Sequence, residues 1–522
     1  MIRDFEVGSW KLPLELERLR NRLESIRLTP YDSAIALMGA VLVYFVVTAI
    51  AASSQLWHDE LFTYYIAKSP SMPRFWEEIR LDLNPPLMYL AARYSIGMFG
   101  DSEYATRLPA IIAFLLGSLC FYRFVSRRLP PVFGLFAVLV FWASPFMYHA
   151  AEARPYGLII GFFGIAMLAW QRALEPNRTR ASVLVLAGAV VGMMLSHLFA
   201  VFYVLPFCLA ELVRWYRTRT LDLPVWASLL LPVIIPFAYM QKMTRFEASV
   251  FPPSFQASAW KIGKFYYADI QSESFILLVA LVLALLVGLR RDPLRVRINA
   301  SLTVNEYAFT GGVLAIPILV NLALMVSRGA FFERYAAPTE FGIALSAAFL
   351  LAILTGANRL SSAVACCCLL LYIAVPALDA LRVKVLRGDS NQVSAIDRVH
   401  PELPLVAASG LTFLEMDKYA DPATVSRLYY LTDRDLAIRY AHATIFEGFP
   451  TLKKYFPIRA IVEPYEDFVA AHPQFLVLGT PEYPEDWLLR RLLDIHATVQ
   501  YLGDFAGPYK DTHLYEATMP GR

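Results

Sequence analysis

Long apolar runs alternate with short polar links over about three quarters of the chain. The runs, such as 34–57 and 183–196, contain no charged residue, and arginines gather in several of the links. A helix needs roughly 20 apolar residues to cross a bilayer, so this pattern predicts repeated transmembrane helices. Hydropathy indicates about eleven spans, at approximately 34–56, 107–123, 131–148, 156–172, 182–196, 198–213, 224–240, 273–289, 308–326, 335–355 and 361–381.

The arginines of the links predict the orientation of the chain. Arginines gather in four links between spans, and the order of the spans places these links on the same side of the membrane. The links are 123–128, 172–180, 214–219 and 290–297. Positive charge favours the cytoplasmic face, so we expect these links and the N-terminus to be cytoplasmic. An odd number of spans then places everything after residue 385 on the opposite face.

The chain divides into three predicted parts. Residues 1–30 are charged and amphipathic and predict a helix lying on the inner membrane surface. Residues 31–384 form the transmembrane domain, whose outer loops 57–106 and 241–272 are too long to be simple turns. In 385–522 short apolar runs alternate with polar helical stretches, which predicts a soluble α/β domain. The predicted fold is an α-helical polytopic membrane protein with a C-terminal α/β domain.

Composition supports a membrane protein and excludes other classes. Of the 522 residues, 57% are hydrophobic and only 17% are charged, where a soluble domain carries about 25%. The formal net charge of +3 gives no basis for nucleic-acid binding. All five cysteines lie in apolar stretches, which argues against a disulfide framework or a cysteine metal site.

Polar residues gather where predicted spans meet the outer face, and ionisable groups at such places are usually functional. A carboxylate there can take a proton from a hydroxyl, and guanidinium groups can hold a phosphate. These residues predict a site that activates a hydroxyl beside an anionic lipid. The clusters are His58-Asp59-Glu60, Asn84-Pro85-Pro86-Leu87, Glu103 to Pro109 with Arg107, His149 to Tyr156 with Glu152 and Arg154, Ser196-His197, and Arg334-Tyr335.

In this order the clusters resemble the polyprenyl-phosphate-sugar glycosyltransferases of the GT-C fold. More narrowly, the chain is similar to bacterial relatives of the protein O-mannosyltransferases and of the lipid A aminoarabinose transferase (glycosyltransferase families 39 and 83). The similarity covers about the first 360 residues. Each motif is short, and the specificity comes from their order and their common membrane face.

The resemblance implies roles for individual residues. Asp59 matches the acid after the first span that serves as catalytic base, and Glu60 matches its acidic neighbour in the same site. Arg107 and Arg154 fall in motifs whose arginines face the lipid phosphate. The aminoarabinose branch has lysine where this chain has Asn84. A neutral amide cannot supply that charge, so the donor is expected to be held differently.

Simpler structural roles compete with these assignments. Glu60 can instead favour the N-terminus of a short helix. Arg154 can pair with Glu152, and Arg107 with Glu103, four residues earlier on a helix.

The other candidate donor-binding residues have similar alternatives. His149 and His197 can each satisfy a buried hydrogen bond, and no ligand cluster accompanies them that would indicate a metal site. Arg334 can contact phosphate or extend its side chain to the membrane surface.

The expected reaction moves a sugar from a polyprenyl-phosphate donor to a hydroxyl of a lipid, glycan or protein acceptor. The resemblance implies an inverting displacement with Asp59 as base, although Glu60 as a nucleophile would allow double displacement. No nucleotide-binding fingerprint is visible, and a role for Mg²⁺ or Mn²⁺ stays open. The expected location is the bacterial inner membrane, with the site on the periplasmic or outer face. The alternatives are a lipid-linked oligosaccharide ligase or polymerase and, from another class, a transporter.

Overall fold

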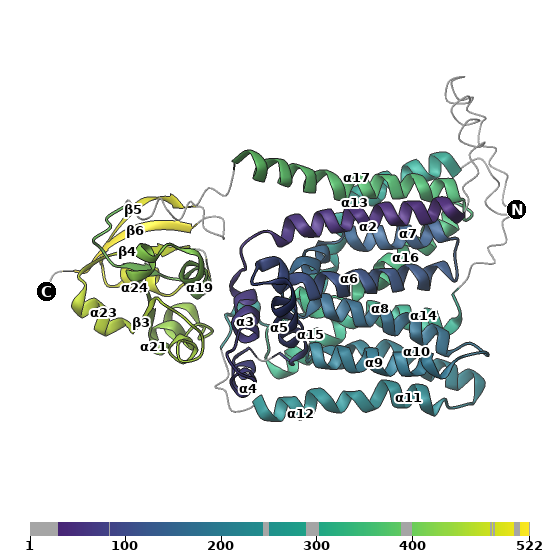
Figure 1. Cartoon of the computed structure of the whole chain (residues 1–522), viewed down its shortest axis with the longest axis horizontal. Coiled ribbons are helices and arrows are strands. Elements are labelled where there is room, and N and C mark those ends of the chain that lie inside the picture. Colours follow the sequence, from purple (N-terminus) through teal and green to yellow (C-terminus); the bar gives the residue numbers. More distant parts are fainter. Residues whose placement is uncertain are drawn as a thin grey trace, which may run out of the picture.

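The computed structural model describes residues 30–82, 84–243, 250–288, 302–387, 399–480, 483, 486–505 and 512–520. The interfacial helix predicted for residues 1–30 lies, apart from its last residue, outside the described residues. The described chain forms a bundle of roughly parallel and antiparallel helices with a smaller α/β domain at one end (Figure 1).

Helices of very different lengths make up the bundle. The α-helices are α2 (Pro30–Ala52), α3 (His58–Ala67), α4 (Met72–Glu78), α5 (Leu87–Phe99), α6 (Glu103–Ser126), α7 (Pro131–Ala143), α8 (Tyr156–Ala173), α9 (Arg180–Ser196), α10 (Ala200–Thr218), α11 (Leu223–Leu230), α12 (Ile234–Met243), α13 (Ala259–Gly288), α14 (Val304–Leu314), α15 (Ile316–Ser327), α16 (Thr339–Leu354) and α17 (Arg359–Arg387). Short 3-10 helices are η1 (Ile79–Leu81), η2 (Pro145–Ala151), η3 (Leu231–Val233), η4 (Pro253–Phe255) and η5 (Glu333–Ala336).

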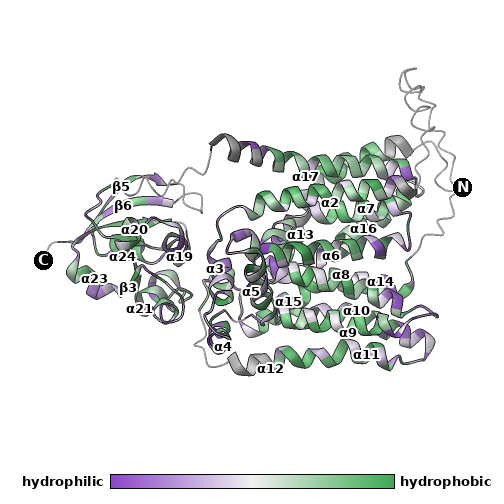
Figure 2. Ribbon diagram, in the orientation of Figure 1, coloured by the Kyte–Doolittle hydropathy of each residue, from purple (hydrophilic) through white to green (hydrophobic). Residues whose placement is uncertain are grey.

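The bundle is that of a multi-pass membrane protein. Within the described residues, four helices are long and apolar enough to cross a bilayer, or six when two bent pairs each count as one span. The bent pairs are α7 with η2, at 84°, and α14 with α15, at 44°. Every predicted span has a helix in the structure, but several are short, so the predicted number of spans stays a prediction. Hydrophobic residues cover the middle of the bundle and polar residues lie toward its ends (Figure 2).

Helices α6 and α8 pack with their backbones very close together. A Cβ atom on Gly117 of α6 would lie 2.4 Å from the carbonyl oxygen of Ile160, and one on Gly161 of α8 would lie 2.6 Å from that of Ala113. Only glycine allows the two backbones to come this close, as small residues commonly do between membrane helices. The contact matters for the site because Arg107 lies near the start of α6 and Arg154 just before α8.

The arginine-rich links that the structure describes lie at the bundle end opposite the α/β domain (Figure 1). Arg128 Nε lies 2.9 Å from Glu306 Oε2 at the start of α14. Arg178 and Arg214 both pair with Asp222, the latter at 3.2 Å. These ion pairs involve three of the four arginine-rich links, at 123–128, 172–180 and 214–219. The fourth link, 290–297, lies outside the described residues, and the orientation of the chain stays a prediction.

Three short α-helices lie in the segment between α2 and α6. Helices α3, α4 and α5 lie across the bundle end that faces the α/β domain (Figure 1). Pro73 lies in the first turn of α4, and Pro86 immediately precedes α5. Proline suits these positions because it cannot donate the backbone hydrogen bond of a helix interior.

The C-terminal domain is built on a six-stranded sheet in the order β3-β2-β1-β4-β6-β5. Strands β1 to β4 are parallel, and β6 pairs antiparallel with both β4 and β5. This confirms the predicted fold class, a helical membrane domain followed by an α/β domain. The strands are β1 (Leu405–Ala407), β2 (Leu428–Thr432), β3 (Ile461–Pro464), β4 (Gln474–Gly479), β5 (Thr498–Phe505) and β6 (Thr512–Thr518). The helices are α19 (Gly410–Tyr419), α20 (Pro422–Ser426), α21 (Arg434–Leu436), η6 (Ala437–Ala441), α22 (Phe449–Leu452), α23 (Tyr465–Ala471) and α24 (Leu488–Asp494).

Candidate active site

Helix α3 begins directly after the extended segment that follows α2, and it places two acids in its first turn. Asp59 and Glu60 lie near the helix N-terminus, where the partial positive charge of the backbone favours carboxylates. Although they are neighbours in sequence, their side chains point to different surroundings. The Asp59 carboxylate belongs to a partly open cluster of charges with Arg154 and Arg334. The Glu60 carboxylate belongs to a closed ion pair with Arg107.

Asp59 lies at the centre of the open cluster. Its Oδ2 is 3.3 Å from Nη2 of Arg334 and 3.9 Å from Nη2 of Arg154, and its Oδ1 is 3.3 Å from Nδ1 of His58. The Asp59 side chain is 21% exposed, so it remains reachable. Burial raises the pKa of Asp59, but the combined effect of Arg154, His58 and Arg334 is larger and holds the pKa below its usual range. The carboxylate is therefore ionised at neutral pH.

A second carboxylate shares one of these arginines. Nη1 of Arg154 donates to Asp82 Oδ2 at 2.7 Å and to the backbone oxygen of Asp59 at 3.0 Å. Tyr89 also donates to Asp82 Oδ2, at 2.7 Å, and Asn84 Nδ2 donates to the backbone oxygen of Asp82 at 3.2 Å. Asn84 thus holds the segment that carries Asp82. Asp82 belongs to none of the predicted site motifs, and the only signal for it in the sequence is its place two residues before Asn84.

Glu60 and Arg107 form the closed pair. Arg107 donates to Glu60 through Nε at 2.7 Å and through Nη2 at 2.5 Å, and the backbone nitrogen of Ala153 donates to Glu60 Oε1 at 2.6 Å. Arg107 also donates to the backbone oxygen of Ala52, the last residue of α2, and to two backbone oxygens in the segment that follows it. The Glu60 side chain is 1% exposed and that of Arg107 is 3% exposed. Arg107 therefore pairs with Glu60 and anchors α3 to α6 rather than contacting Glu103.

His149 lies beside the closed pair and is bound to another acid. Its Nδ1 contacts Glu152, whose Oε1 accepts a 3.0 Å hydrogen bond from Trp57 Nε1. Glu152 is therefore engaged with His149 and Trp57, and Arg154 binds Asp59 and Asp82 instead. The sequence left two roles open for Arg154, contact with the lipid phosphate or an ion pair with Glu152. The structure replaces the ion pair with contacts to Asp59 and Asp82, which the sequence did not predict.

His197 is buried behind the open cluster. Its Nδ1 accepts a 3.1 Å hydrogen bond from the backbone nitrogen of Phe199, and its ring lies 5.6 Å from Tyr156 and 5.5 Å from Tyr335 between ring centroids. Burial, reinforced by Arg154 and Arg334, lowers the pKa of His197 to about 3. A neutral imidazole adds no charge to the cluster, so His197 supports it by packing against the rings of Tyr156 and Tyr335.

Arg334 approaches the cluster from η5, between α15 and α16. Its guanidinium carbon lies 4.9 Å from the ring centroid of Phe332 and 5.7 Å from that of Tyr156. In the described part of the chain, the Nε atoms of Arg334 and Arg154 are buried without hydrogen-bond partners. Buried donors are usually satisfied. The cluster therefore has donor capacity left for an anion.

The acids do not form a metal-binding arrangement. Among the residues that the structure describes, no three histidine, cysteine, aspartate or glutamate side chains are grouped to hold a metal ion. The two acids of the open cluster have the guanidinium of Arg154 between them, where a shared cation would otherwise lie.

Comparisons with known proteins identify the fold. The family model described as "Dolichyl-phosphate-mannose-protein mannosyltransferase" matches residues 83–240. Two crystal structures of ArnT from Cupriavidus metallidurans, one apo and one bound to undecaprenyl phosphate, match with TM-scores of 0.53 and 0.52. Each match is 13% identical and covers 92% of this chain and 97% of that chain.

The chain has the GT-C glycosyltransferase fold. The resemblance found in the sequence is thus confirmed, both to the O-mannosyltransferases and to the aminoarabinose transferase. No curated protein sequence matches the chain. The family match within the GT-C fold includes Arg107 and Arg154, while Asp59 and Arg334 lie on either side of it.

Proposed function

We propose that this chain transfers a sugar from a polyprenyl-phosphate-linked donor to an acceptor hydroxyl, with Asp59 as general base. The observation that carries the proposal is the ionised, partly exposed Asp59 carboxylate between Arg154 and Arg334. A base and two phosphate-binding groups then lie within one site. The relatives support the donor class, since one ArnT structure is bound to undecaprenyl phosphate.

The two arginines hold the donor phosphate and stabilise its charge when the sugar leaves. Guanidinium groups bind phosphate oxygens through paired donors. The unpartnered Nε atoms of both arginines agree with this role. A donor phosphate bound to Arg154 and Arg334 would also weaken their interaction with the Asp59 carboxylate. The basicity of Asp59 therefore rises when the donor arrives, which matches a base that is needed only in the complex.

The reaction is a single displacement. The acceptor oxygen attacks the anomeric carbon while its proton passes to Asp59, and the bond from the anomeric carbon to the phosphate oxygen breaks. The polyprenyl phosphate departs with the bonding electrons, and Arg154 and Arg334 meet the new negative charge. Attack opposite to the leaving group inverts the anomeric configuration.

A double displacement would need a second reachable carboxylate as nucleophile. Glu60 is enclosed by Arg107 and by backbone donors. Asp82 is held by Arg154 and Tyr89. We therefore assign Glu60 to holding α3 in place and keep Asp59 as the only group that acts on the acceptor.

The charges at the site also suggest independence from metal ions. Arg154 and Arg334 supply the positive charge that a divalent cation would otherwise provide. Transfer is therefore expected to continue after treatment with EDTA, and restoration of lost activity by Mg²⁺ or Mn²⁺ would contradict this part of the proposal.

The proposed orientation puts the reaction on the outer or periplasmic face of a bacterial inner membrane. The described arginine-rich links, at 123–128, 172–180 and 214–219, lie at the opposite bundle end, and that end is expected in the cytoplasm. A cysteine introduced at the exposed Asp494 should react with a membrane-impermeant maleimide from outside intact spheroplasts. Labelling only after lysis would reverse the orientation.

The deciding experiment uses the full chain in lipid nanodiscs with radiolabelled polyprenyl-phosphate sugars and membrane extracts as acceptor. Wild type and the control Asp494→Asn, on the exposed end of α24, should transfer label, and Asp59→Asn should lose at least a hundredfold in rate. Equal transfer by Asp59→Asn would exclude Asp59 as base. Activity only with a lipid-linked oligosaccharide would instead indicate a ligase.

A further inference from the structure

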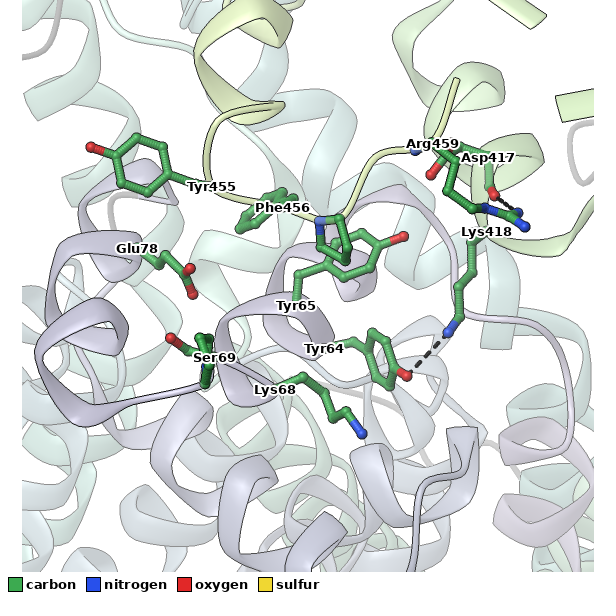
Figure 3. A pocket seen from close by; sticks show the side chains of 12 residues that line it. Tyr64, Tyr65, Lys68, Ser69, Glu78, Asp417, Lys418, Tyr455, Phe456 and Arg459 are labelled. Atoms are coloured by element: carbon green, nitrogen blue, oxygen red, sulfur yellow. Dashed lines mark hydrogen bonds between the residues drawn. The ribbon is translucent and has the colours of Figure 1, made fainter. Parts of the chain in front are cut away.

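A cavity lies between the transmembrane domain and the C-terminal domain, away from the charged cluster. Its volume is about 610 Å³, within the range of small-molecule sites. Figure 3 shows that one wall comes from α3 and α4 and the other from α19 and the segment before β3. It is lined by Tyr64, Tyr65, Lys68, Ser69, Pro70, Glu78, Asp417, Lys418, Tyr455, Phe456, Pro457 and Arg459.

The proposed reaction does not use this cavity. Lys68, just past the end of α3, follows Asp59 by nine residues, which is about two and a half helical turns. Tyr64, Tyr65 and Lys68 therefore lie on the side of α3 opposite Asp59. A molecule in the cavity would contact the far side of the helix that carries the candidate base.

Aromatic rings dominate the buried part of the lining. Tyr64, Tyr65 and Phe456 are 8%, 6% and 3% exposed, and the rings of Tyr65 and Phe456 lie 5.2 Å apart between centroids. Tyr455 adds a fourth ring at the edge (Figure 3). Rings of this kind offer flat apolar surface together with tyrosine hydroxyls. That combination fits the C–H face and the hydroxyl groups of a sugar ring.

Two polar groups in the lining have hydrogen-bonding capacity left, a buried carboxylate oxygen and a tyrosine hydroxyl. Glu78 is 1% exposed, and its Oε2 has no hydrogen-bond partner while its Oε1 accepts from Arg74. A buried carboxylate oxygen is usually satisfied. Tyr65 lines the cavity, and within the described residues no hydrogen bond reaches its hydroxyl. One acceptor and one hydroxyl are thus available to a ligand that brings hydroxyl groups.

The cations of the lining are already engaged. Lys68 pairs with Asp101 at 2.9 Å, Lys418 donates to the Tyr64 hydroxyl at 3.1 Å, and Arg459 contacts the backbone oxygen of Asp417. Asp417 in turn accepts from the backbone nitrogens of Arg459 and Ala460. A phosphate or carboxylate ligand would have to displace these contacts, so the lining favours an uncharged ligand.

We infer that this cavity binds a neutral carbohydrate, whose ring packs on Tyr65 and Phe456 and whose hydroxyls bond to Glu78 and Tyr65. This inference rests on the proposed function. It adds that the acceptor of that reaction is a glycan or a molecule that carries one. The cavity holds a sugar of the acceptor that is remote from the reacting hydroxyl, and Asp59 acts on another part of the same molecule.

The test measures binding, so it does not depend on transfer. Full-length protein in nanodiscs is mixed with the methyl glycosides of mannose, glucose and galactose, with N-acetylglucosamine, and separately with inorganic phosphate. Saturation-transfer NMR then reports binding and competition. At least one sugar should bind, and phosphate should not displace it. Tyr65→Phe and Glu78→Gln should each weaken binding about fivefold, the value of one hydrogen bond.

Two control variants separate this site from others. Tyr501→Phe changes an exposed tyrosine of β5, and Asp59→Asn changes the candidate base; both should leave sugar binding unchanged. Binding that is lost in Asp59→Asn, or that is insensitive to both cavity variants, would overturn the inference, as would binding of phosphate alone or of no sugar.

A second measurement uses only the wild type. A diazirine derivative of the sugar that binds should crosslink to peptides around Tyr65 and Phe456, and labelling elsewhere only would contradict the assignment. If sugar binds here while no transfer is found, the proposed function fails and the binding site stands. If transfer is found without binding, only the site is lost.

Discussion

Glu415 of the C-terminal domain accepts a 2.9 Å hydrogen bond from the backbone nitrogen of His58, the first residue of α3. Glu415 is 3% exposed and His58 is 7% exposed. The His58 ring also packs against Phe446 of the C-terminal domain, with centroids 5.5 Å apart, and its Nδ1 lies beside Asp59. The C-terminal domain thus supplies one of the acceptors for the backbone N–H groups at the start of the helix that presents the candidate base.

We expect Glu415 to be a positioning residue for Asp59. In Glu415→Ala the first turn of α3 loses one capping acceptor, which is worth about 1 kcal/mol, so kcat should fall roughly fivefold while the KM for donor changes little. Glu415→Gln keeps an acceptor oxygen and should retain most of the activity. Initial rates at varied donor concentration measure both constants.

A purely structural role would give another result. It would lower the amount of folded protein in both variants and leave the kcat of the folded fraction unchanged. The activity should therefore be normalised to protein recovered as a single peak in size-exclusion chromatography. Equal kcat for Glu415→Ala and wild type on that basis would rule out positioning.

Arg334 should determine affinity for the donor phosphate. Removing a charge-assisted hydrogen bond costs about 1.5–3 kcal/mol, so Arg334→Met should raise the KM for donor roughly ten- to hundredfold. Arg334→Lys should recover only part of this loss, because an ammonium group lacks the planar fork of donors. Arg328→Lys, at an exposed arginine after α15, is the matched control and should behave as wild type. An unchanged KM in Arg334→Met would remove this residue from the donor site.

The pH profile should report the charge around Asp59. A base must be unprotonated to act, and the arginines hold the pKa of Asp59 below its usual value. The kcat/KM of wild type should therefore not fall until the pH drops below about 4, the ordinary pKa of aspartate. Loss of one guanidinium raises the pKa, so the acid limb of Arg334→Met should move to higher pH. An acid limb near neutral pH in wild type would point to another base.

The sequence predicted which residues belong to the site better than it predicted which residues they contact. Hydrophobic runs and proline positions indicated the helices, and the order of short motifs indicated the GT-C fold. Motifs could not show that Arg107 binds Glu60, because the two residues are 47 positions apart and meet only when α3 packs on α6. Asp82 and Glu415 have no motif of their own. Their roles arise from contacts that only the folded chain creates.

The Glu60–Arg107 pair should be important for stability. Both side chains are buried, and breaking a buried pair leaves an unpaired charge at a cost of about 3–5 kcal/mol. Arg107→Met should therefore lower the thermal unfolding midpoint in nanodiscs strongly, and the double variant Arg107→Met, Glu60→Gln should recover part of the loss because no charge stays unpaired. As a control, Arg439→Met breaks an exposed pair with Asp494 and should shift the midpoint little. If Arg107→Met unfolds like wild type but loses donor affinity, Arg107 belongs to the phosphate site after all.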